Sequence, residues 1–346
     1  MAEPAPNRTW HPAVAVLKIS KVPFWFIWVT PFAFAYLASA PPGGSTHLAW
    51  FVVSVAGICL VESATCIHNE LVDHEEDAAN QPRRPALVRS VGEPVLWRMA
   101  LVGYLVSLGG AIATGILVKP VVAVMMLAAW LAAPIYNWGV RLKRRPGWAE
   151  LDIAWATFFG YLAGWTWHQP VSTVPATVWV VTFFFGVSAL MKDLPDVVGD
   201  ESVSAPSVFS LRSRPARRLA LACIAVTPYV LVIALAATRQ LPERMLALLV
   251  LGVVGVAVMV LGERANTLET FILAYELAFY YVHLFMLTLF VLYSPSALTL
   301  LVAACLLLGR TLALGLRLAP RFVEPTFTWA GSWRGLVRGH LKAGVA

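Results

Sequence analysis

Apolar stretches of about twenty residues recur along this chain with short polar segments between them. Hydrophobic residues make up 59% of the 346 residues and charged residues only 13%, whereas soluble domains carry roughly 25% charged residues. A helical stretch of this length spans a bilayer, and the runs are too continuous for the alternating strands of a membrane barrel. The sequence therefore predicts an all-α, polytopic transmembrane helix bundle in the lipid bilayer.

Nine or ten spans fit the chain and leave no room for a separate soluble domain. The candidate stretches lie near residues 22–40, 48–68, 95–118, 120–138, 150–168, 173–192, 217–238, 243–262, 269–293 and 296–318. Arg310 interrupts the last of them. We expect a cytoplasmic N-terminal segment (1–21), a single transmembrane domain (22–318) and a basic C-terminal tail (319–346).

Basic residues are concentrated in alternate loops. The loops after the second, fourth and sixth stretches carry Arg83, Arg84, Arg89, Arg98, Arg141, Lys143, Arg144, Arg145, Lys192, Arg212, Arg214, Arg217 and Arg218. The opposite loops carry only Lys119, Arg239 and Arg244. Because cytoplasmic loops are enriched in Lys and Arg, the N-terminus and the three basic loops are predicted to be cytoplasmic. The net charge of +7 is thus explained by membrane anchoring and not by a nucleic-acid partner.

The second stretch ends in an acidic segment. Asn69, Asp73 and Asp77 are spaced four residues apart, so in a helix they share one face. Taken alone, this pattern is also compatible with a solvated helix end.

A second acidic segment ends the sixth stretch. Asp193, Asp196 and Asp200 follow Lys192 at helical spacing, although Pro195 should disturb the helix and place the last carboxylate in a turn. Taken alone, this segment could be a polar cap.

The two segments together indicate a shared metal site. Clustered carboxylates repel unless cations hold them, and Mg²⁺ prefers carboxylate oxygens and substrate phosphates. We predict that both segments meet at a central cavity that opens to the cytoplasmic side. Nearby basic residues that suit a diphosphate are Arg84, Lys143 and Lys192, with Arg141 in the same loop as Lys143.

Three segments in order resemble the signatures of the UbiA superfamily of intramembrane prenyltransferases. The first reads Asn69…Asp73…Asp77…Asn80-Gln-Pro82-Arg-Arg84-Pro85, and the loop segment reads Pro134-Ile-Tyr136-Asn-Trp-Gly-Val-Arg141-Leu-Lys143-Arg144. The third reads Lys192-Asp193-Leu-Pro-Asp196-Val-Val-Gly-Asp200, and its Lys-Asp-x-Pro-Asp form is most similar to the homogentisate and chlorophyll branches.

The resemblance implies a role for each matching residue. Asp73 and Asp77 would hold one Mg²⁺ with support from Asn69, and Asp193 and Asp196 would hold another with help from Asp200. The diphosphate would contact Asn69, Arg84, Arg141, Lys143 and Lys192, and Tyr136 would lie near the reacting carbon. The segment after the third motif, residues 202–210, departs from the Gly-containing, Thr-Leu-like family pattern.

The implied function is Mg²⁺-dependent transfer of a prenyl group from a prenyl diphosphate to a phenolic or quinone-precursor acceptor. A terpene cyclase with the same metal clamp is the alternative, since both reactions ionise the same substrate. A transporter is disfavoured, because transporter sites lie near the bilayer midplane and these segments lie at span ends.

Overall fold

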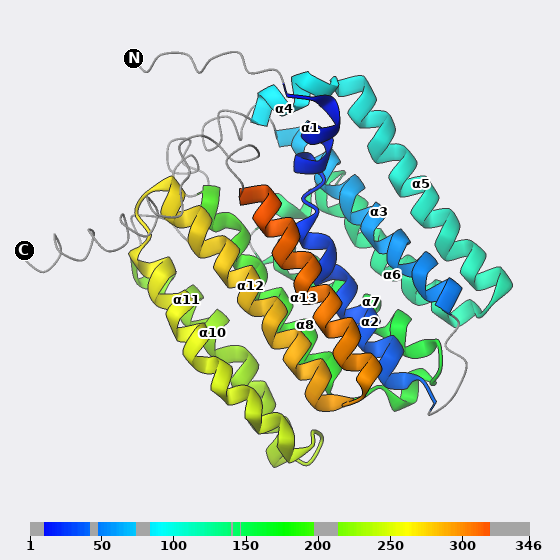
Figure 1. Cartoon of the computed structure of the whole chain (residues 1–346), viewed down its shortest axis with the longest axis vertical. Coiled ribbons are helices and arrows are strands. Elements are labelled where there is room, and N and C mark those ends of the chain that lie inside the picture. The colour runs from blue at the N-terminus through cyan, green and yellow to red at the C-terminus, as the bar shows by residue number, and fades with distance from the viewer. Residues whose placement is uncertain are drawn as a thin grey trace, which may run out of the picture.

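The computed structural model describes residues 10–41, 48–73, 84–139, 141–145, 147–196 and 214–318, and every regular element in this part is helical (Figure 1). The elements are α1 (Pro12–Ile19), α2 (Pro23–Ser39), α3 (Leu48–Asp73), α4 (Arg84–Val91), α5 (Glu93–Leu117), α6 (Pro120–Asn137), η2 (Leu142–Arg144), α7 (Trp148–Thr166), η3 (Val171–Thr173), α8 (Thr177–Ser188), η4 (Ala189–Asp196), α10 (Arg214–Ala237), η5 (Glu243–Leu251), α11 (Gly252–Arg264), α12 (Leu268–Tyr293) and α13 (Ala297–Leu318).

Each of the ten predicted stretches coincides with a helix. Within the described residues, eight helices are long and apolar enough to cross a bilayer, and the bent pair of α1 and α2 raises this number to nine. Helix α7 is not among them: at 19 residues it is long enough, but it carries Glu150 and Asp152 in its first turns, which lower its mean hydropathy. It packs against α2, α6 and α8 inside the bundle.

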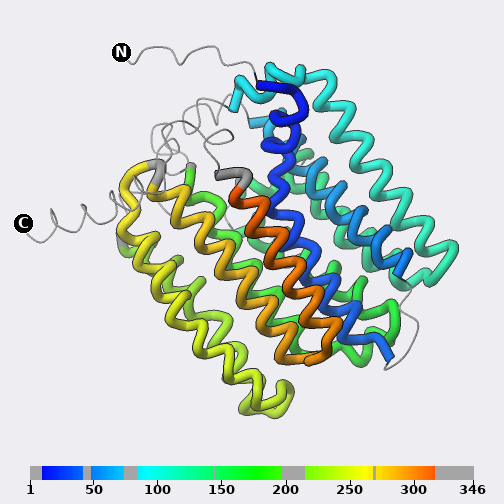
Figure 2. The backbone as a smooth tube through the Cα atoms, in the orientation of Figure 1, coloured from blue at the N-terminus to red at the C-terminus, as the bar shows by residue number. Residues whose placement is uncertain are grey.

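The helices divide into an inner and an outer set. About two thirds of the apolar windows of Thr177–Pro195 and Thr270–Tyr293 are buried (67% each), compared with 17% for Ala297–Gly315. Helix α2 lies between α3 and α13 and also contacts α7 and α12 (Figure 2). Helices α10 and α11 pack together on one flank, and α3 packs on α5 at the other (Figure 1).

Helices α2 and α7 approach each other closely at Gly164. A Cβ atom at this position would lie 2.3 Å from the carbonyl oxygen of Phe32 and 3.0 Å from the backbone nitrogen of Tyr36. Only glycine leaves room for this contact, because the obstructing atoms belong to the backbone and cannot rotate away.

Polar side chains inside the bundle are joined across helices. The buried Arg310 of α13 donates from Nη1 to the carbonyl oxygen of Pro23 at 2.6 Å, which explains how an arginine is accommodated within the last stretch. The Oγ1 atom of Thr30 lies 3.0 Å from Nε2 of His283. The first link anchors the start of α2, just after its 45° bend from α1 near Lys21, whose φ is +46°, and the second anchors the middle of α2.

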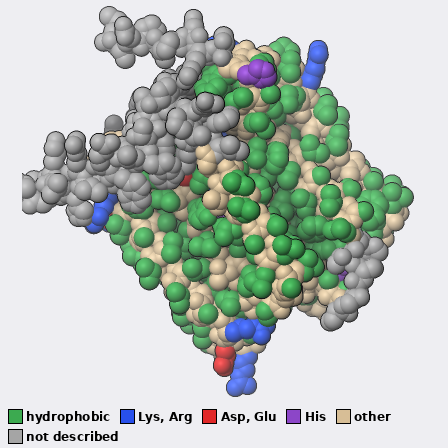
Figure 3. All heavy atoms as spheres, in the orientation of Figure 1, with side chains coloured by type: hydrophobic (Ala, Val, Ile, Leu, Met, Phe, Trp, Pro, Cys, Tyr) green, Lys and Arg blue, Asp and Glu red, His purple; other side chains and the backbone are tan. Residues whose placement is uncertain are grey.

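The outer surface is apolar over the middle of the bundle. Hydrophobic side chains cover most of the face in Figure 3, while Lys and Arg side chains lie toward its two ends. Exposed large hydrophobic residues occur on α3, α5, α10, α11 and α13, as expected for helices that face lipid.

We predict that Gly164→Ala destabilises the protein. The added methyl group must push α2 away from α7, and overpacking of this kind costs about 1 to 3 kcal/mol. The thermal unfolding midpoint in detergent measures the loss. Gly109→Ala is the matched control, since a Cβ at Gly109 meets nothing within 4 Å and should leave the midpoint unchanged or raised. Equal midpoints for both variants would contradict the packing argument.

Candidate active site

The first acidic segment is held by a lysine from a distant loop. Asn69 and Asp73 lie one turn apart on the last turns of α3 and share a face. The Lys143 ammonium in η2 donates to Oδ1 of Asn69 at 3.1 Å and forms an ion pair with Oδ2 of Asp73. Two side-chain oxygens of α3 therefore converge on one cation.

Glu70 is a further carboxylate here that the sequence reasoning did not single out. It is buried, and its Oε1 atom lies 3.8 Å from Nζ of Lys21 and 3.6 Å from Nη1 of Arg84. Lys21 comes from the bend between α1 and α2, and Arg84 begins α4. Arg84 thus faces Glu70 in this structure, and its contact with a diphosphate remains a prediction.

The second acidic segment lies on a 3₁₀-helix. The chain tightens after Ser188, and η4 carries Lys192, Asp193 and Asp196, with Pro195 inside it. Asp193 and Asp196 are three positions apart in its backbone, which is one full turn of such a helix. The expected disturbance at Pro195 therefore takes the form of a change of helix type that begins well before the proline.

Lys192 joins this segment to α7. Its Nζ atom donates to Oε1 of Glu150 at 2.7 Å and lies 3.3 Å from Oδ1 of Asp193. The other Glu150 oxygen accepts a hydrogen bond from the backbone nitrogen of Gly147 at 2.9 Å. Glu150 was not predicted; the signal for it is an acidic residue in the first turn of a helix otherwise built of apolar residues.

Tyr136 lies beside the second acidic segment, and Arg141 lies beside the first. Tyr136, on the last turn of α6, lies within electrostatic range of Lys192, Asp193 and Glu150. Arg141 has a left-handed backbone conformation (φ +48°) and lies within electrostatic range of His68, beside the first segment. The structure therefore brings Asn69, Asp73, Arg141 and Lys143 together, and it brings Tyr136, Lys192 and Asp193 together.

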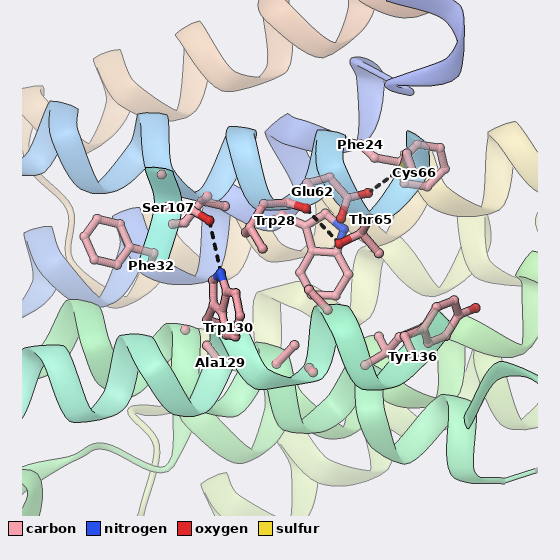
Figure 4. Close-up of a pocket in the computed structure, with 18 of the residues that line it drawn as sticks. Phe24, Trp28, Phe32, Glu62, Thr65, Cys66, Ser107, Ala129, Trp130 and Tyr136 are labelled. Atoms are coloured by element: carbon pink, nitrogen blue, oxygen red, sulfur yellow. Dashed lines mark hydrogen bonds between the residues drawn. The ribbon is translucent and has the colours of Figure 1, made fainter. Parts of the chain in front are cut away.

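A cavity of about 270 Å³ reaches one residue of each acidic segment. Its polar end is lined by Asn69, Tyr136 and Lys192, so both acidic segments border the same space. From Asn69 the wall follows α3 down to Val53, which corresponds to about 24 Å of helix. In Figure 4 the cavity lies between α3 and α6, with Tyr136 near one end and Phe32 near the other.

The walls away from the polar end are built of small and aromatic residues. The aromatic rings come from Trp28, Trp130 and Phe185. Between them the wall consists of small Ala and Gly residues of α3, α5, α6 and α7, which leave space open. A Cβ at Gly57, Gly110 or Gly160 would meet nothing within 4 Å, so these three positions widen the cavity.

Two carboxylates also line the cavity. Glu62 lies on α3, two turns before Asn69, and Asp152 lies near the start of α7. Glu62 accepts a hydrogen bond from the thiol of Cys66 at 3.3 Å (Figure 4). The sequence reasoning missed both, although a carboxylate within an apolar stretch is itself a signal of a functional site.

Among the described residues, the end of α3 offers the oxygen ligands that Mg²⁺ prefers. Asn69 and Asp73 direct two oxygens at the ammonium of Lys143, so these two side chains are placed to share one cation. Among the described residues no three His, Cys, Asp or Glu side chains form a metal-binding group. Asp77 and Asp200 lie outside the described residues, and for Asp196 only the backbone is described.

Comparison with known proteins identifies the family. The profile of the UbiA prenyltransferase family matches residues 27–275, well over half of the chain. The chain belongs to the UbiA prenyltransferase family. Solved structures similar to this UbiA family member include digeranylgeranylglyceryl phosphate synthase (TM-score 0.56, 15% identity, 82% of this chain and 99% of that chain). Another is a UbiA homologue from Archaeoglobus fulgidus bound to GPP and Mg²⁺ (TM-score 0.53, 15% identity, 85% of this chain and 99% of that chain).

A curated relative extends the comparison. Chloroplast chlorophyll synthase of Arabidopsis thaliana is 23% identical over 208 residues, which is 56% of this chain and 52% of the relative. The match therefore spans only about half of that protein's length. Family membership and the apolar helices together make this UbiA family member an integral, multi-pass membrane protein.

We predict strong coupling between Glu150 and Lys192. Removing one partner leaves the other charge largely buried and without its partner. The stability losses of the single variants Glu150→Gln and Lys192→Met should therefore add up to more than the loss in the double variant. The coupling free energy in a double-mutant cycle should be about 1 to 3 kcal/mol. The exposed pair Arg218 and Glu263 is the control, with an expected coupling of about 0 to 1 kcal/mol. Similar couplings for both pairs would refute a special role for the Lys192 contact.

Proposed function

We propose that this chain transfers a prenyl group from a prenyl diphosphate to an aromatic acceptor within the membrane and releases diphosphate. The observation that carries the proposal is a continuous cavity. Asn69 and Lys192 line its polar end, and mostly apolar residues line the rest. The Archaeoglobus fulgidus homologue binds GPP and Mg²⁺, which supports the same substrate class here.

Six residues are proposed to hold Mg²⁺. They are Asn69, Asp73 and Asp77 from the first segment and Asp193, Asp196 and Asp200 from the second. Bound Mg²⁺ would offset the negative charge that develops on the departing diphosphate.

The basic residues around this site are proposed to bind the diphosphate. Lys143 and Lys192 already lie beside the acidic segments, and Arg141 lies next to the first one. Arg84 would have to turn from Glu70 to join them. Each cation stabilises the leaving group electrostatically and fixes the position of the allylic carbon.

The reaction breaks one bond and forms another. The C–O bond to diphosphate breaks, and its electron pair stays on the diphosphate oxygen. The acceptor carbon donates a π electron pair to the allylic carbon, and a base then removes the proton from that acceptor carbon. Tyr136 is proposed to lie near the reacting carbon, because it borders the cavity beside Lys192.

The apolar walls protect the cationic carbon. Aromatic rings at Trp28 and Phe185 border the cavity and present faces that attract a cation. A chamber walled by these side chains also limits water, which would otherwise quench the cation. We further propose that the polar end faces the cytoplasm, as the distribution of Lys and Arg predicts.

We predict that Asp73→Ala and Asp193→Ala each lower turnover by about a hundredfold or more, because each removes a charge that organises the metal and diphosphate. Chelation of divalent metal should abolish turnover of the unaltered protein. Diphosphate release in detergent micelles or proteoliposomes measures both effects. Glu243→Ala, an exposed carboxylate at the start of η5, is the control and should keep full activity. Undiminished turnover in both aspartate variants would remove the basis of the proposal.

Product analysis separates transfer from cyclisation. With Mg²⁺ and a panel of prenyl diphosphates, we expect a prenylated product only when a phenolic acceptor is present. A cyclised hydrocarbon formed without acceptor would establish the cyclase instead, and a transporter would release no diphosphate at all.

A further inference from the structure

The cavity contains two carboxyl groups that the proposed binding of metal and diphosphate does not use. Glu62 and Asp152 line it from two different helices, α3 and α7, and neither belongs to the acidic segments. Both side chains are only partly buried, and α3 and α7 each border the cavity, so the carboxylates are accessible from inside it.

Neither carboxylate is neutralised by a cation of its own. Asp152 makes no ion pair or hydrogen bond with any described residue, and its one described interaction is electrostatic, with Tyr136. Glu62 accepts hydrogen bonds from the side chains of Cys66 and Trp28, and it lies within electrostatic range of Lys21.

The two cavity-lining lysines are already engaged elsewhere. Lys21 lies 3.8 Å from Glu70. Lys192 lies 2.7 Å from Glu150 and 3.3 Å from Asp193. Glu62 and Asp152 therefore remain as hydrogen-bond acceptors on the cavity wall that form no ion pair with either of these two lysines.

Carboxylates inside an apolar bundle are costly, and a hydrocarbon chain gains nothing from them. A second substrate that carries hydrogen-bond donors would instead be bound by these carboxylates. The position along α3 fits this role, since Glu62 lies about 10 Å from Asn69 along the helix axis, below the proposed diphosphate site. Asp152 lies close to Tyr136, near the proposed reacting carbon.

We infer that Glu62 and Asp152 bind the acceptor and select one that presents hydroxyl donors and no negative charge to the cavity. This inference rests on the proposed transferase function. Phenolic hydroxyl groups donate to the two carboxylates, whereas a carboxylate on the acceptor is repelled by them. The acceptor class is thus an uncharged polyhydric phenol, or a larger molecule whose entering part has this chemistry.

Two acceptors that differ by one carboxylate test the inference. Hydroquinone and 2,5-dihydroxybenzoate are compared with geranyl diphosphate as donor, and the affinity for each acceptor is also measured without donor or metal. We expect the unaltered protein to prefer hydroquinone by about tenfold or more in kcat/KM, the scale expected when a buried charge opposes one substrate.

The informative variants are Glu62→Gln and Asp152→Asn, which keep the side-chain shape and remove the charge. Each should raise the KM and the dissociation constant for hydroquinone about tenfold and narrow the preference over 2,5-dihydroxybenzoate. The KM for geranyl diphosphate should stay within about twofold, because its proposed contacts are separate. Glu243→Gln makes the same change at an exposed site and should leave all constants unchanged.

The outcomes are separable. Unaltered hydroquinone constants in both variants, or a preference of the unaltered protein for 2,5-dihydroxybenzoate, would overturn the inference while leaving the transferase function intact. Absence of Mg²⁺-dependent diphosphate release with every acceptor would overturn the proposed function. In that case the binding measurements decide the inference alone, and equal hydroquinone affinity in all proteins counts against it.

Discussion

An ionised group in a low-dielectric environment is stable only beside an opposite charge, and this constraint organises the polar end of the bundle. Glu70, Asp73 and Glu150 are each matched there by a cation from a different segment. Lys143 ties the loop after α6 to Asp73 of α3, and Lys192 ties η4 to Glu150 of α7. The ion pairs therefore act as cross-links between helices, and the cavity mouth keeps its shape because these segments are fixed to one another.

The same constraint explains the contrast between the two ends of the cavity. Groups that can be paired or can meet a charged ligand are gathered near Asn69 and Lys192, where diphosphate and metal are proposed to bind. Farther along α3 the lining is apolar, with Glu62 as an exception. A charged head and a hydrocarbon tail would thus find matching surroundings in one continuous space.

Much of this arrangement could be predicted from the sequence. Continuous apolar stretches fixed the helices, and the spacing of Asn69 and Asp73 placed both on one face of α3, as observed. Other features depend on contacts between distant segments, which periodicity does not encode. Examples are the 3₁₀ geometry around Asp193, the pairing of Lys192 with Glu150, and the turn of Arg84 toward Glu70. Helix α7 was found as a helix, but its acidic first turns kept it from the set of clear membrane spans.

The three glycines that widen the cavity have a consequence for how such a protein could diversify. A methyl group introduced at Gly57, Gly110 or Gly160 would meet no atom within 4 Å and so leave the helix contacts untouched. Gly164 is different, because there the neighbouring backbone fills the place of a side chain. The size and shape of the cavity can therefore change through single substitutions at the first three positions, while Gly164 keeps α2 and α7 in contact.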